Sequence, residues 1–127
     1  MTAAYLWFNA AMYLIFALLC TLKSGKTTVA QGFLTLDNNG RCEYFAIYGG
    51  MEMGFAAFYA ICAMKPEFRS AGLLFSQCMY AGIVVWRMTA LVSLNGISPM
   101  TKGIAALEVV LFAGAAYLNY AAKTAQT

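Results

Sequence analysis

The stretch Tyr48-Gly49-Gly50-Met51-Glu52-Met53-Gly54 places a carboxylate among glycines inside a long apolar segment. A charge at that depth in a membrane costs free energy, so it needs a partner or a function. Two further charged residues, Arg87 and Glu108, lie in apolar segments of their own. We therefore expect a small helical bundle that is arranged around these three residues.

The composition predicts an integral membrane protein. Of the 127 residues, 62% are hydrophobic and only 10% are charged, whereas about a quarter of the residues of a soluble domain carry a charge. Apolar runs near the length of about 20 residues that a membrane-spanning helix needs lie at 3–22, 44–64, 70–92 and 103–122. Only helices and closed barrels satisfy their backbone groups in lipid. The sequence thus predicts an all-α, four-helix transmembrane bundle, with 1–127 forming a single membrane domain.

The connections between these runs indicate how neighbouring helices are arranged. The charged turn Lys65-Pro66-Glu67-Phe68-Arg69 ends the second helix at its proline. The segment Ser93–Lys102 is a short loop whose serine can cap the fourth helix, and short loops predict antiparallel neighbours. The longer segment Lys23–Glu43 has too few apolar residues to span. We expect it to lie at the membrane interface, followed by an Asp37-Asn38-Asn39-Gly40 turn.

The three charges inside the spans fall at similar depths. A helical rise of about 1.5 Å per residue places Glu52 about 12 Å, Arg87 about 9 Å and Glu108 about 7–8 Å from the helix ends on one membrane face. Because a guanidinium group can bond two carboxylates at once, we predict a Glu52–Arg87–Glu108 cluster. Two interpretations stay open: a structural network that fixes which helices pack together, or a site that binds a ligand or handles protons.

A second polar layer is predicted nearer the other membrane face, from Asn9, Gln77 and Asn119. Asn119 follows Glu108 by eleven residues, almost three turns, so both residues share a helix face. A polar track through the bundle is one interpretation. Hydrogen bonds that hold neighbouring helices together are the more common role of such amides.

Small residues give the second helix a smooth flank. Gly50 and Gly54 form a G-x-x-x-G pair, and Gly49 adjoins it. Small residues let helix backbones approach closely. We expect this flank to serve packing within the bundle rather than dimerisation.

The residue types present argue against several kinds of site and partner. The chain has no histidine, and its four cysteines form no C-x-x-C pair, so we predict no metal ion, no cofactor and no set of catalytic residues. The net charge of +3 is scattered, so nucleic acid is not an expected partner. Membrane lipid is the expected partner, and other membrane subunits or a second copy of the chain stay open.

The chain has a family resemblance that rests on four short spans, the Tyr48-Gly49-Gly50-Met51-Glu52 motif, Arg87 late in the third span and Glu108 in the fourth. It resembles an uncharacterised family of small bacterial membrane proteins related to the DoxX-like proteins. The resemblance covers roughly Leu6 to Leu118. It implies a four-helix bundle in a bacterial inner membrane and no established reaction, although some DoxX-like relatives are described as subunits of quinone-linked oxidoreductases.

Three classes of function remain. The first, which we favour, is an accessory or structural subunit of a larger membrane complex. The second is a small proton-coupled transporter or channel that uses Glu52, Arg87 and Glu108. The third is a membrane enzyme, or a binder of a lipid-soluble substrate such as a quinone, with the glutamates as acid and base. The absence of a catalytic constellation disfavours an enzyme.

Overall fold

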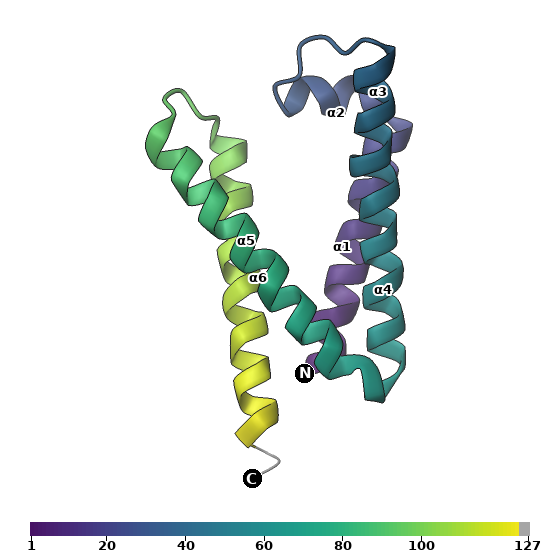
Figure 1. Ribbon diagram of the computed structural model, residues 1–127, viewed down its shortest axis with the longest axis vertical. Coiled ribbons are helices and arrows are strands. Elements are labelled where there is room, and N and C mark those ends of the chain that lie inside the picture. The colour runs from purple at the N-terminus through teal and green to yellow at the C-terminus, as the bar shows by residue number, and fades with distance from the viewer. Residues whose placement is uncertain (125–127) are drawn as a thin grey trace. The chain divides into compact units, whose positions relative to one another are not determined.

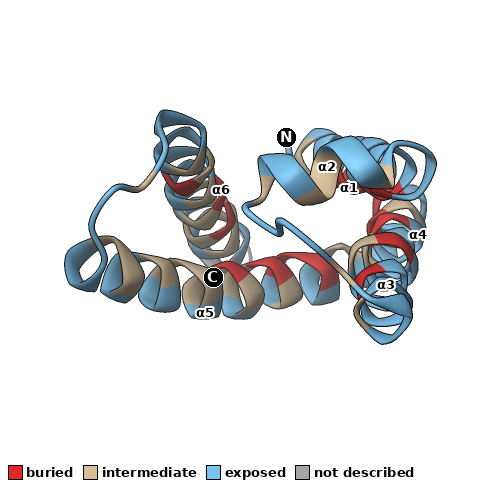
Figure 2. Ribbon diagram, turned by 90° about the horizontal axis from the view of Figure 1, so that it is seen from above, coloured by how far each residue is buried: buried red, intermediate tan, exposed pale blue. Residues whose placement is uncertain are grey.

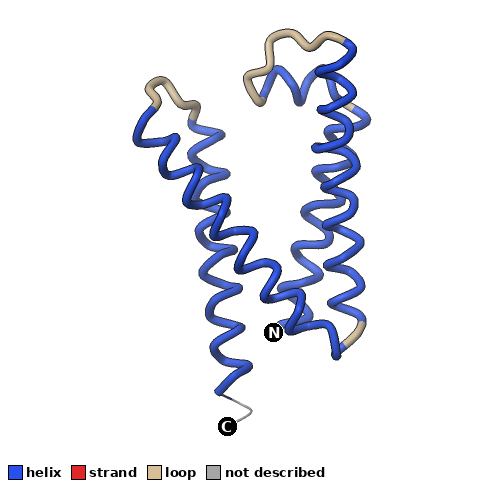
Figure 3. The backbone as a smooth tube through the Cα atoms, viewed as in Figure 1, coloured by secondary structure: helices blue, strands red, loops and turns tan. Residues whose placement is uncertain are grey.

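Helices dominate the computed structural model of the chain, which describes residues 1–124 (Figure 1). In chain order the elements are α1 (Thr2–Leu22), α2 (Ser24–Ala30), α3 (Asn38–Tyr44), the π-helix η1 (Phe45–Met51), α4 (Glu52–Met64), the 3₁₀-helix η2 (Pro66–Phe68), α5 (Arg69–Ser93) and α6 (Pro99–Thr124). Figure 3 shows helices and loops, and no strand, over these residues. The all-α prediction is confirmed.

Among the described residues, four helical runs are long and apolar enough to cross a membrane: Thr2–Leu22, Asn38–Met64, Pro66–Ser93 and Pro99–Ala122. The first agrees closely with the predicted span 3–22. In the third, α5 (Arg69–Ser93) agrees closely with the predicted span 70–92, and the short helix η2 precedes it. The fourth begins at Pro99, four residues before the predicted start. Ser98 explains the earlier start, because its Oγ accepts a hydrogen bond from the Thr101 backbone N–H at 3.2 Å, and a proline suits the first position after such a cap.

The second run also begins earlier than predicted, at Asn38 rather than at 44. The carboxylate of Asp37 accepts a hydrogen bond from the Gly40 N–H at 2.7 Å and so caps α3. The predicted turn at Asp37–Gly40 is therefore wrong, because the residue types that favour turns also cap helices. The run ends as predicted: Lys65 is extended (φ −104°, ψ 109°), as the ring of a following proline requires.

The chain divides into two compact units. The first unit is Ala3–Pro66; the second holds the chain from Glu67 on, together with Met1 and Thr2. In the first unit α1 lies beside α4 in both Figure 1 and Figure 2. Tyr13 of α1 stacks on Tyr59, with 5.7 Å between ring centroids, and meets Phe55 edge-on at 5.5 Å. Such aromatic pairs contribute about 0.5–1.5 kcal/mol each beyond the area that they bury.

The segment after α1 is held against the second run by aromatic residues. Tyr44 donates a hydrogen bond to Thr27 Oγ1 of α2 at 2.9 Å and stacks on Tyr48 at a centroid distance of 4.7 Å. Phe33, in the loop after α2, meets both tyrosine rings edge-on. The short helix α2 and its loop are therefore fixed at the end of the first unit, where α1 ends and α3 begins.

The second unit is a helical hairpin of α5 and α6, which pack along each other. Their connection turns at Gly96, whose φ of 75° lies in the left-handed region that favours glycine. The short loop makes the two helices antiparallel, as predicted.

Candidate functional site

Two of the three predicted intramembrane charges meet in the second unit. Arg87 Nε donates to Glu108 Oε2 at 2.5 Å, and Arg87 Nη2 donates to Glu108 Oε1 at 2.7 Å. This is the two-point geometry in which a guanidinium group matches a carboxylate best. Side-chain exposure is 12% for Glu108 and 32% for Arg87. The pair thus satisfies both carboxylate oxygens and brings the two charges into one neutral unit.

The predicted amide layer also forms a pair in the second unit. Asn119 Nδ2 donates to Gln77 Oε1 at 2.8 Å. Gln77 and Arg87 are ten residues apart on α5, and Glu108 and Asn119 are eleven apart on α6. Because these separations nearly match, both polar pairs fit one antiparallel register, about 15 Å apart along the hairpin. Together they link α5 to α6 at two levels.

Asn9, the third member of that predicted layer, belongs to the first unit. It is fully buried on α1, and its Nδ2 donates to the backbone oxygen of Tyr5, one turn earlier, at 2.9 Å. Its proposed association with Gln77 and Asn119 stays a prediction, because these two residues belong to the second unit.

Glu52 differs from Glu108 in its surroundings. It is the first residue of α4, directly after the π-helix η1. Its Oε2 atom is buried, and no hydrogen-bond donor of the first unit (Ala3–Pro66) reaches it. Since Glu52 belongs to the first unit and the Arg87–Glu108 pair to the second, the predicted three-residue cluster stays a prediction.

The helix register of the first unit indicates which part of α1 faces Glu52. Gly49 lies against Thr21, and Tyr13 packs against α4 further along. In an antiparallel pair of helices, a residue three positions after Gly49 on the second run lies at the level of a residue about three positions before Thr21 on α1. From this spacing we expect Glu52 to lie near Ala17 and Leu18. Neither residue has a polar side chain, so α1 offers the carboxylate no donor at this level.

The three glycines of the predicted flank differ in what surrounds them. A Cβ on Gly49 would lie only 2.9 Å from Thr21 Oγ1. A Cβ on Gly54 would meet nothing within 4 Å among the described residues, and one on Gly50 would meet only the Phe45 oxygen of its own helix at 3.9 Å. In the first unit the close approach therefore lies at Gly49, whereas Gly50 and Gly54 are exposed.

Substitution of Gly49 and of Gly54 should change the stability of the protein by different amounts. We expect Gly49→Leu to lower the free energy of unfolding by about 1–3 kcal/mol, because the new side chain must displace α1 at Thr21. Gly54→Leu, which points into open space, should change it by less than about 0.5 kcal/mol. Titration of the purified protein in mild detergent with a denaturing detergent measures both. Equal losses would contradict a close approach that is specific to Gly49.

Two features of the first unit were not predicted from the sequence. One is the π-helix η1, which includes Gly49 and Gly50; short π-helical segments occur often at functional sites. The other is a cleft beside Arg41. Among the described residues, no group of three or more histidine, cysteine, aspartate or glutamate side chains could hold a metal ion. The four cysteines are free thiols.

No protein-family model matches the chain, and neither a curated protein nor a solved structure matches it. The resemblance to the DoxX-like proteins therefore stays a prediction.

Proposed function

We propose that the chain is an accessory subunit of a larger membrane complex and that Glu52 binds a neighbouring polypeptide. The observation that carries this proposal is the buried Oε2 atom of Glu52, which no donor of the first unit reaches. A buried acceptor without a partner costs about 1–3 kcal/mol, and more when it is charged. A hydroxyl, amide or cationic group on another helix would remove that cost.

The second unit supports this proposal by contrast. There four polar side chains inside the spans form two hydrogen-bonded pairs, Arg87 with Glu108 and Gln77 with Asn119. The Nε atom of Arg69, at the start of α5, is buried without a partner among the described residues. Polar groups that hydrogen-bond each other hold a hairpin together and have few donors or acceptors left to bind a ligand. Glu52 has no such bond at Oε2, so it is the residue of this group that is best suited to an external contact. The DoxX-like resemblance supports a bacterial inner membrane as the location.

Co-purification tests the proposal. A tagged chain should be expressed in its own host, extracted in mild detergent and separated by size, with the partner quantified by mass spectrometry. We expect a partner polypeptide in fixed ratio with the wild type and its loss with Glu52→Gln. Glu43→Gln, which alters an exposed carboxylate in the same helical run, should keep the partner. A lone chain or homo-oligomer that Glu52→Gln leaves unchanged would contradict the proposal.

A second candidate function is proton-coupled transport, which the π-helix directly before Glu52 favours. A carboxylate without a donor in a span can take up and release a proton. Purified protein in liposomes should then carry a proton flux that Glu52→Gln abolishes and Glu43→Gln leaves intact. A wild-type protein that carries no flux would exclude this candidate.

A further inference from the structure

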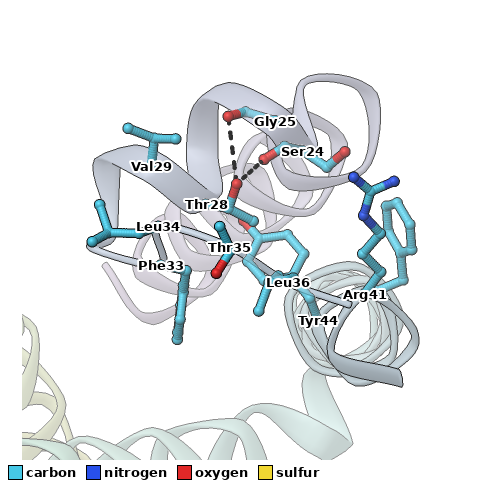
Figure 4. Close-up of a pocket in the computed structure, with 11 residues that line it drawn as sticks. Ser24, Gly25, Thr28, Val29, Phe33, Leu34, Thr35, Leu36, Arg41 and Tyr44 are labelled. Atoms are coloured by element: carbon cyan, nitrogen blue, oxygen red, sulfur yellow. Dashed lines mark hydrogen bonds between the residues drawn. The ribbon is translucent and has the colours of Figure 1, made fainter. Parts of the chain in front are cut away.

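A cleft of about 470 Å³ lies in the first unit, between α2, the loop that follows it and the start of the second run (Figure 4). This volume falls within the range of about 300–1,000 Å³ that is typical of small-molecule sites. The cleft has polar and apolar walls: Ser24, Thr35 and Arg41 contribute polar side chains, and Phe33 and Leu36 contribute apolar ones. It is therefore suited to an amphiphile rather than to a purely apolar ligand.

Arg41 supplies a cation without an acid partner. No carboxylate among residues 1–124 forms an ion pair with its guanidinium group. Asp37, one turn before it, is engaged in capping α3 through the Gly40 N–H. The five N–H donors of a guanidinium group match the oxygen atoms of a phosphate group in pairs. The hydroxyl groups of Ser24 and Thr35 add two further donors to the cleft walls.

The position of the cleft along the spans indicates where its ligand comes from. It lies where the candidate span Thr2–Leu22 ends and the span Asn38–Met64 begins, a level at which lipid headgroups are found. Two apolar side chains that line the cleft are also open to their surroundings, with exposures of 86% for Leu34 and 60% for Val29. Basic residues beside exposed apolar residues are typical of segments that bind anionic lipid.

We infer that this cleft binds the headgroup phosphate of an anionic phospholipid. Arg41 holds the phosphate, the hydroxyl groups of Ser24 and Thr35 bond its oxygens or the glycerol, and the acyl chains run over Val29 and Leu34. The site is separate from Glu52 and depends on no protein partner, so it goes beyond the proposed function, and neither result decides the other.

Lipid titration tests this inference. Delipidated protein in mild detergent is titrated with phosphatidylglycerol and, separately, with phosphatidylcholine, and bound lipid is counted by native mass spectrometry. We expect one saturable phosphatidylglycerol site, weakened about tenfold or more by Arg41→Gln, which removes charged hydrogen bonds. Lys26→Gln is the matched control: it removes one positive charge from α2 but lies outside the cleft walls, and it should weaken binding by less than about threefold.

Further variants and ligands make the result specific. Arg41→Lys keeps the positive charge but loses the two-point hydrogen bonding of the guanidinium group, and it should give an intermediate affinity. This variant also keeps the test possible if circular dichroism shows that Arg41→Gln does not fold. Equal weakening by Arg41→Gln and Lys26→Gln would overturn the inference in favour of diffuse attraction. Equal binding of phosphatidylcholine would overturn the preference for anionic lipid. Displacement of the lipid by inorganic phosphate at matched concentration would indicate a free-anion site and would overturn the lipid assignment.

Discussion

Glu108→Leu should lower the free energy of unfolding of the α5–α6 hairpin by about 3 kcal/mol. The substitution leaves the Arg87 guanidinium group inside the span without the carboxylate that it bonds at two points. Breaking a buried ion pair by removing one partner costs about 3–5 kcal/mol. We expect the lower end of that range, because Arg87 is 32% exposed and its long side chain can reach toward the interface. Denaturing-detergent titration followed by circular dichroism measures the change.

The double variant Arg87→Met/Glu108→Leu is the control for this effect. Replacing both members of a buried ion pair by apolar residues is often neutral or stabilising. The double variant should therefore unfold within about 1 kcal/mol of the wild type. If the double variant is as unstable as Glu108→Leu alone, the loss of stability comes from lost packing rather than from an unpaired charge. The prediction that the ion pair stabilises the hairpin would then be wrong.

Glu52→Leu should change the free energy of unfolding in the opposite direction. Because Oε2 of Glu52 is buried and no donor of the first unit reaches it, its removal should stabilise the isolated chain by about 1–3 kcal/mol. The same titration measures this gain, and Glu52→Gln should give a smaller one because its amide is still polar. A loss of stability with Glu52→Leu would show that the chain itself satisfies this carboxylate.

The contrast between the two glutamates separates structure from function. Both lie in apolar spans and look alike in the sequence. Glu108 is engaged within its own hairpin, so replacing it harms folding. Glu52 has a buried oxygen that no donor of the first unit reaches, so this unit retains an acceptor whose burial opposes stability. Residues that reduce stability in this way are often kept because a function requires them.

The spans were predictable because lipid imposes a length and a composition that hydropathy reveals. The Arg87–Glu108 pair was predictable from the short loop, which makes the third and fourth helices antiparallel neighbours. The start of the second run at Asn38 was not, because Asp37-Asn38-Asn39-Gly40 suits a turn as well as a helix cap. The π-helix leaves no mark in composition.

The register of the first unit depends on tertiary contacts and was likewise hidden. Whether Gly49 or Gly50 meets α1 depends on how η1 turns the helix, which spacing alone does not give. The cleft at Arg41 forms only when α2, its loop and α3 come together. The sequence of Lys23–Glu43 indicates only that this segment has too few apolar residues to span.

The most direct test of our proposal is the amount of partner polypeptide that co-purifies, per mole of chain, with the wild type and with Glu52→Leu in mild detergent. We expect a fixed ratio with the wild type. With Glu52→Leu we expect a loss of about tenfold or more, which corresponds to about 1.4 kcal/mol of lost association energy, although the variant itself resists unfolding better. A wild-type chain that purifies alone, or a Glu52→Leu chain that keeps its full complement of partner, would contradict the proposal.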